Sequence, residues 1–192
     1  MHSLESLPLF PLHKVLLPGA AMDLRIFERR YLDLVRDCGR AGSGFGVCLI
    51  LEGSEAGAPA TPAAYGVEAR IENFDMGEDG LLSLRVRGHR RFHVVRTRVR
   101  DNGLVMADVE WLCADEDWEI RPEHALLGTL LQTMMEKVGS DLNGLPPRIF
   151  EHAAWVGWRL AQVLPITPEQ RVSILQEDDV HARLQRLLEW ID

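Results

Sequence analysis

The spacing of the apolar residues changes near residue 115, and this change constrains the fold more than any other feature of the 192-residue chain. Before that point apolar and polar residues mostly alternate, which predicts β-strands whose successive side chains point to opposite faces of a sheet. After it the apolar residues recur every three or four positions, as on one face of a helix. The sequence therefore predicts an α+β protein, with a β-rich domain over residues 1–114 and a helical domain over residues 115–192.

Turn signals and prolines indicate that the sheet is curled. Residues 79–80 (Asp-Gly) and 101–103 (Asp-Asn-Gly) separate alternating runs and predict hairpins, the second with an Asn-Gly pair that tolerates positive φ at both turn positions. Pro8, Pro11 and Pro18 interrupt the first apolar run. Prolines are tolerated in strands at edges, ends and bulges, where small β-barrels bend, so we expect a barrel-like sheet.

Helices are expected in both parts. Helical spacing predicts a helix from Tyr31 to Cys38 that stops at Gly39, and residues 53–64, rich in Gly, Ala and Pro, predict a mobile surface loop. In the helical domain Thr167 and Gln170 predict a capping box. The four helices expected there cover residues 122–138 with Gly139 closing the first, about 147–164 with Val163 on the buried face, a third from 167 and a fourth after 178.

Composition excludes several classes of protein. A formal net charge of −8 argues against a surface matched throughout to nucleic acid or anionic lipid. No run approaches the roughly 20 apolar residues of a membrane span, and the first residues lack a secretory pattern. The three cysteines form no Cys-x-x-Cys pair, which disfavours a disulfide framework or a structural zinc site. We therefore expect a cytoplasmic protein without a membrane partner.

Three segments, in order, resemble the N-terminal domain of the Lon protease family. They are "LPLFPLHKVLLPGAAMDLRIFERRYLDLV", then "YGVEARIENF" with "LSLRVRGHRRFHV", then "LAQVLPITPEQRVSILQEDDVHARLQRLL". The resemblance implies a PUA-like β pseudo-barrel followed by a helical bundle, and a role in recognising protein substrates. It also implies a stand-alone domain, without the family's ATPase and protease domains.

No catalytic, cofactor or metal site is predicted. A phosphate-binding loop needs a lysine after a glycine turn, and neither Lys14 nor Lys137 follows that pattern. No nucleophile and base can be paired from the sequence. His89 and His93 stand four apart on an expected strand, about 13 Å along it, which is too far for one ion.

An arginine-rich segment, residues 85–100, stands out in this acidic chain. On a strand Arg85 and Arg87 share one face, as do Arg96, Arg98 and Arg100. This arginine stripe could bind RNA phosphates or acidic segments of a partner. The structural alternative is a solvated face paired with the chain's own carboxylates.

Four tryptophans are candidates for a peptide-binding surface: Trp111, Trp118, Trp155 and Trp158. Trp155 and Trp158 face away from the main apolar stripe of their helix, so that helix is either buried on two sides or presents aromatic surface to a partner. Trp111 and Trp118 flank the expected domain boundary and either hold the two parts together or line a groove. The leading hypothesis is a non-enzymatic module that binds unfolded or flexible protein segments through these residues, and the alternative is RNA binding by the arginine stripe.

Overall fold

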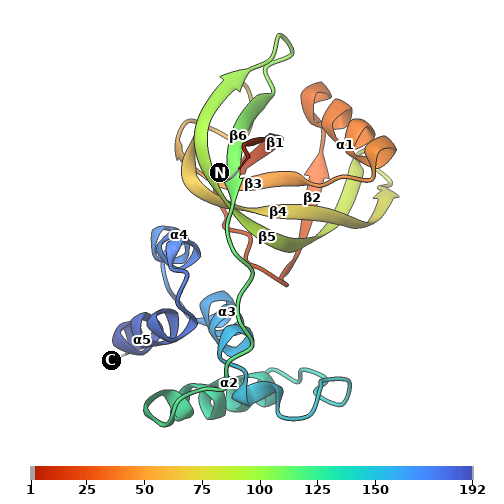
Figure 1. The fold of residues 1–192 in the computed structure, drawn as a ribbon. Coiled ribbons are helices and arrows are strands. Elements are labelled where there is room, and N and C mark those ends of the chain that lie inside the picture. The colour runs from red at the N-terminus through yellow and green to blue at the C-terminus, as the bar shows by residue number, and fades with distance from the viewer. Residues whose placement is uncertain (1–2, 192) are drawn as a thin grey trace. The chain divides into compact units, whose positions relative to one another are not determined.

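The computed structural model describes residues 3–191 (Figure 1). The chain divides into two compact units between Leu112 and Cys113, and each unit is described by itself. The N-terminal unit is β-rich and the C-terminal unit is helical, so the predicted α+β class is confirmed.

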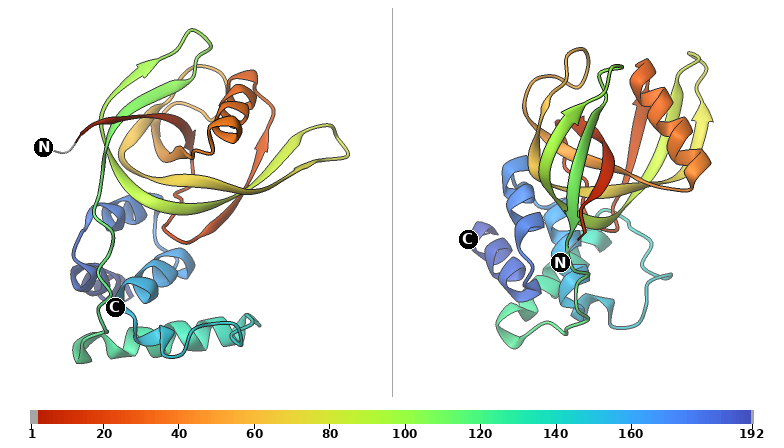
Figure 2. Two further views of the ribbon diagram at one scale, coloured as in Figure 1. Left: turned by 45° about the vertical axis from the view of Figure 1, so that its right-hand side comes forward. Right: turned by 45° about the horizontal axis from the view of Figure 1, so that its top comes forward.

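The N-terminal unit is a barrel made from one six-stranded sheet. The sheet has the order β2-β5-β4-β3-β1-β6, and a further pairing of β5 with β6 closes five of the strands into a ring (Figure 2). Among the described residues, the sixth strand, β2, pairs only with β5, so its other edge is unpaired. The strands are β1 (Glu5–Leu12), β2 (Ala21–Ile26), β3 (Phe45–Glu52), β4 (Thr61–Met76), β5 (Leu82–Val99) and β6 (Val105–Trp111).

Strand β1 changes its pairing partner directly after Pro8. Residues 5–8 pair antiparallel with β6, whereas residues 9–12 pair parallel with β3. Pro8 is the last residue of the first pairing, where a missing backbone donor is tolerated because the ladder changes sides there. The first half of β1 thus pairs with β6 and the second half with β3, so β1 joins these two strands within the ring.

Both predicted hairpins are present, but the expected turn geometry at residues 101–103 is wrong. Only Gly103 has positive φ, whereas Asn102 does not. The Gly103 amide donates to the Arg100 carbonyl, and the Arg100 amide donates to the Leu104 carbonyl. This is a type I turn followed by one left-handed glycine. An Asn-Gly pair is compatible both with this turn and with the expected two-residue turn that has positive φ at both positions.

Two further sequence expectations need correction in this unit. Helix α1 (Arg29–Ala41) continues through Gly39 and is capped by Gly42. Gly42 has φ 63°, a left-handed conformation that glycine adopts without strain. The expected loop over residues 53–64 is shorter, because β4 already begins at Thr61 and buries Ala63.

The C-terminal unit contains α2 (Ala125–Lys137), α3 (Ala153–Val163), α4 (Pro168–Gln176) and α5 (Val180–Ile191). The capping box at the start of α4 is confirmed: the Gln170 amide donates to the Thr167 hydroxyl, and the Thr167 amide donates to the Gln170 side chain. Among the described helices, none is long and apolar enough to cross a membrane.

The second predicted helix begins later than expected. Arg148 has φ 61° and His152 is extended and forms a β-bridge with Glu119, so residues 149–151 make only a single 3₁₀ turn before α3.

The buried faces of the helices are also narrower than the sequence pattern suggests. Val163 at the end of α3 is 45% exposed, and Leu126 and Val138 are likewise exposed, because each lies at or beyond an end of its helix.

Candidate functional site

Trp155 and Trp158 lie on α3 and make contacts within the C-terminal unit. Trp158 is buried, its indole Nε1 donates to Asp115 Oδ2 at 2.6 Å, and the Arg183 guanidinium lies 4.1 Å from its ring centre. Trp155 is half-buried and packs edge-on against Phe150. Burial of the helix on a second side therefore accounts for Trp158.

Trp111 and Trp118 differ in exposure. Trp111, on β6, is half-buried, packs edge-on against Phe92 and lies under the Arg90 guanidinium at 3.7 Å. Trp118 is 54% exposed, and its indole donates to Glu116. Of the four candidate tryptophans, Trp118 presents the most surface to a partner, and it stays a candidate.

The arginine stripe is largely paired with carboxylates. Arg85 pairs with Asp23 at 2.9 Å, and Arg87 pairs with Glu72. Arg96 and Arg98 both bind Asp108, whose pKa they hold below its ordinary value, mainly through hydrogen bonds. These pairs use charge that RNA phosphates would need, which favours the structural alternative.

An apolar groove lies between α1 and the hairpin of β4 and β5, which projects from the barrel in Figure 2. We call it the α1 groove; its volume is about 540 Å³, and Arg36 and Arg70 stand at its rim. Phe74 on its wall is 71% exposed and Leu32 is 41% exposed. The apolar residues that line it are Leu32, Val35, Ile71, Phe74, Leu82 and Leu84.

Large apolar side chains are also exposed elsewhere on the N-terminal unit. Phe27 is 61% exposed at the start of α1, and Met76 is 62% exposed at the end of β4. The α1 groove was not predicted from the sequence. The available signal was Phe74 and Met76, two large apolar residues beside the predicted turn at residues 79–80, where the hairpin continues past the core.

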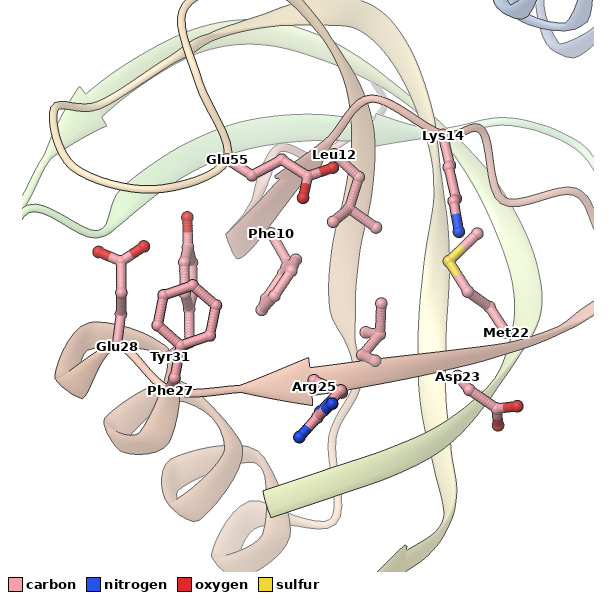
Figure 3. Close-up of a pocket in the computed structure, with 11 residues that line it drawn as sticks. Phe10, Leu12, Lys14, Met22, Asp23, Arg25, Phe27, Glu28, Tyr31 and Glu55 are labelled. Atoms are coloured by element: carbon pink, nitrogen blue, oxygen red, sulfur yellow. The ribbon is translucent and has the colours of Figure 1, made fainter. Parts of the chain in front are cut away.

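A second, smaller pocket lies where β1 and β2 meet the start of α1 (Figure 3). We call it the β1–β2 pocket; its volume is about 220 Å³. Its floor is made of buried side chains, and charged groups surround its mouth. The floor residues are Phe10, Leu12, Leu24 and Tyr31, and the charged residues are Lys14, Asp23, Arg25, Glu28 and Glu55.

Within residues 3–191, no group of three His, Cys, Asp or Glu side chains is placed to hold a metal ion. His89 and His93 lie on β5, a strand, as predicted. Within the described residues the three cysteines form no disulfide; Cys38 and Cys48 are buried, and burial raises the pKa of the Cys48 thiol to about 12. A thiol with so high a pKa is a poor nucleophile.

The C-terminal unit buries a stacked pair of histidines. The rings of His124 and His181 lie 6.2 Å apart, and His124 Nε2 is 2.9 Å from Gln185 Oε1. Burial, followed by the charge of Arg121, lowers the pKa of His181, while Asp179 and Glu123 oppose the shift. The folded chain therefore favours the neutral form of this ring.

We expect the free energy of unfolding to decrease as the pH falls below 6.5, the ordinary pKa of this side chain. The unfolded chain takes up the proton first, so the stabilisation is complete above that pH and is lost progressively toward the lower pKa of the folded state. For one proton the slope is at most about 1.4 kcal/mol per pH unit. Urea denaturation at a series of pH values measures it.

The variant His181→Gln should flatten that slope, whereas His13→Gln, at an exposed position of the N-terminal unit, should leave it unchanged. An equal slope in the wild type and in His181→Gln would show that other groups cause the pH dependence.

Comparisons with known proteins agree on one family. The sequence model of the ATP-dependent protease La (LON) substrate-binding domain matches residues 6–192. The chain is 60% identical to the Lon N-terminal domain protein from Xanthomonas campestris, with 97% of this chain and 98% of that chain covered and a TM-score of 0.84. No match to a curated protein was found.

A more distant structure shares the fold. The N-terminal domain of the Mycobacterium avium complex Lon protease is 18% identical, covers 97% of both chains and has a TM-score of 0.70. The match of the family model over nearly the whole chain decides the assignment. The chain belongs to the family of the Lon substrate-binding domain, as the three sequence segments predicted.

Proposed function

We propose that the chain is a non-catalytic recognition module that binds exposed apolar segments of other proteins in the α1 groove. The observation that carries this proposal is an apolar groove of about 540 Å³ with Phe74 and Leu32 exposed on its walls. Monomeric proteins seldom leave such surface uncovered without a binding role. The family supports the coarser part of the proposal, because its model describes a substrate-binding domain of a protease.

The groove suits a flexible apolar segment better than a folded partner. Its walls come from one helix and one projecting hairpin, so the opening accommodates a few side chains. Binding should be weak for an isolated segment, because ordering a flexible chain consumes much of the contact energy. We place the protein in the cytoplasm, where cysteines without disulfides, as in the described residues, are the rule.

The double variant Phe74→Ser plus Leu32→Ser tests the groove. We expect it to weaken binding of a reduced, carboxymethylated unfolded protein by about tenfold or more, since exposed aromatic anchors carry much of such binding. Fluorescence anisotropy of the labelled unfolded protein measures the affinity. The matched control is Leu126→Ser, an exposed leucine on α2 that is 78% exposed.

An equal loss in Leu126→Ser, or no loss in the groove variant, would reject the groove as the binding surface. Trp118→Ser in the same assay tests the remaining tryptophan candidate. Raising the salt from about 0.05 to 0.5 M should change apolar binding little, whereas steep weakening together with sensitivity to Arg96→Glu plus Arg98→Glu would favour the arginine stripe instead.

A further inference from the structure

The β1–β2 pocket has the size of one side chain. Its volume of about 220 Å³ is below the roughly 300–1,000 Å³ of sites for drug-sized ligands. Phe10, Leu12 and Leu24 are each 6% exposed and form an apolar floor. The pocket therefore suits a single aliphatic or aromatic side chain.

The pocket also runs along the free edge of β2. Four consecutive residues of the strand, 22–25, line it, so the pocket follows β2 over that length. In the described part of the chain β2 pairs only with β5, so its other edge offers amide donors and carbonyl acceptors. An extended main chain is the natural partner for such an edge.

The charged groups at the mouth of the β1–β2 pocket differ in whether they have a partner within the chain. Asp23 pairs with Arg85, Arg25 with Asp79 and Glu28 with Arg30, and Glu55 accepts a hydrogen bond from the His13 amide. The Lys14 ammonium makes no ion pair or hydrogen bond within residues 3–191. Figure 3 shows Lys14 next to Met22, at the end of the pocket where β2 begins.

These features together match the end of a polypeptide. We propose that the β1–β2 pocket binds the C-terminal residue of another protein: an apolar last side chain fills the pocket, the main chain lies along the free edge of β2, and the α-carboxylate pairs with Lys14. Because Lys14 stands where β2 begins, the bound chain runs antiparallel to β2. An N-terminal ammonium fits less well, since the carboxylates at the mouth are already engaged and Lys14 would repel it.

This site is separate from the α1 groove, and the two can be tested independently. The probe is a short peptide ending in leucine with a free carboxylate, compared with the same peptide as a C-terminal amide. We expect the free acid to bind with a Kd of about 0.1–1 mM and the amide at least about tenfold more weakly. NMR titration of the 192-residue chain measures both affinities.

The chain provides a matched control, because it has only two lysines, Lys14 and Lys137. Lys14→Gln should weaken binding of the free acid about tenfold and leave the amide unchanged, whereas Lys137→Gln should change neither. Amine acetylation read by mass spectrometry gives a second measurement. The free acid should slow the modification of Lys14 but not that of Lys137.

Two results would overturn the inference. One is equal binding of the free acid and the amide. The other is equally tight binding of an amidated peptide that carries an internal aspartate next to leucine, since the site would then recognise acidic side chains rather than a chain end. Phe74→Ser plus Leu32→Ser should leave the peptide affinity unchanged, so failure of the α1 groove and failure of this pocket give different results.

Discussion

Replacing Arg183 with alanine should lower the free energy of unfolding of the C-terminal unit by about 3–5 kcal/mol. The Arg183 side chain is 1% exposed, and its guanidinium forms an ion pair with Asp115, with Nη1 3.1 Å from Oδ2. The same carboxylate accepts the indole hydrogen bond of Trp158, and the guanidinium lies against that ring. Removing the arginine leaves the Asp115 charge without its buried counter-ion and opens a cavity beside Trp158.

Urea denaturation of the 192-residue chain gives the size of the effect, and hydrogen exchange assigns it to the C-terminal unit. The matched control is Arg186→Ala on the same helix. Arg186 pairs with Glu177 at 3.2 Å and donates to the Ser173 carbonyl and hydroxyl, but it is 42% exposed, so its loss should cost less than the loss of Arg183, about 1 kcal/mol. Similar losses for the two variants would mean that the Arg183 pair contributes no more than a surface pair.

Replacing Phe92 with alanine should destabilise the N-terminal unit by about 3–5 kcal/mol. Phe92 is fully buried and packs edge-on against Trp111 in the centre of the barrel. Its ring occupies space left by two glycines: a Cβ atom would lie 2.7 Å from the ring if added at Gly46 and 2.6 Å if added at Gly66. The core cluster around it consists of Leu7, Leu9, Cys48, Val105, Ala107 and Val109.

This packing predicts a coupling that a double-mutant cycle can measure. Gly46→Ala alone should cost about 1–3 kcal/mol, because the added methyl meets the side chains of Phe92, Leu9 and Leu7. In a Phe92→Leu background the cost should be smaller by about 0.5 kcal/mol or more. Additive losses would show that the two residues do not compete for the same space.

Helix starts and hairpins were predicted correctly where they depend on residues that are close together in the sequence. The capping box of Thr167 and Gln170 needs only four residues of helix and is present. The hairpin at residues 101–103 was also predicted, but its turn type was not. The φ of Asn102 depends on the register in which β5 and β6 pair, and the Asn-Gly pair is compatible with both turns.

Surface chemistry was harder to predict, because it depends on partners far apart in sequence. Arg96 and Arg98 share the carboxylate of Asp108 from the next strand, and Arg87 pairs with Glu72 from β4. The composition of the segment indicated a basic stripe, and only the strand register shows that carboxylates lie beside it. Trp158 is similar: its spacing suggested either a second buried face or a binding surface, and the contacts with Asp115 and Arg183 support burial.

Apolar periodicity and turn residues were enough to establish a curled sheet followed by helices, because each of these signals acts over a few neighbouring residues. The candidate sites required the assembled units. Phe74 and Leu32 face one groove because the β4–β5 hairpin extends beyond the barrel core beside α1, and Lys14 lines one pocket together with four residues of β2. The first of these placements depends on how far the hairpin extends past the core, and the second on residues of β1, β2 and the segment between them lining one pocket. Neither is encoded in a local pattern of the sequence.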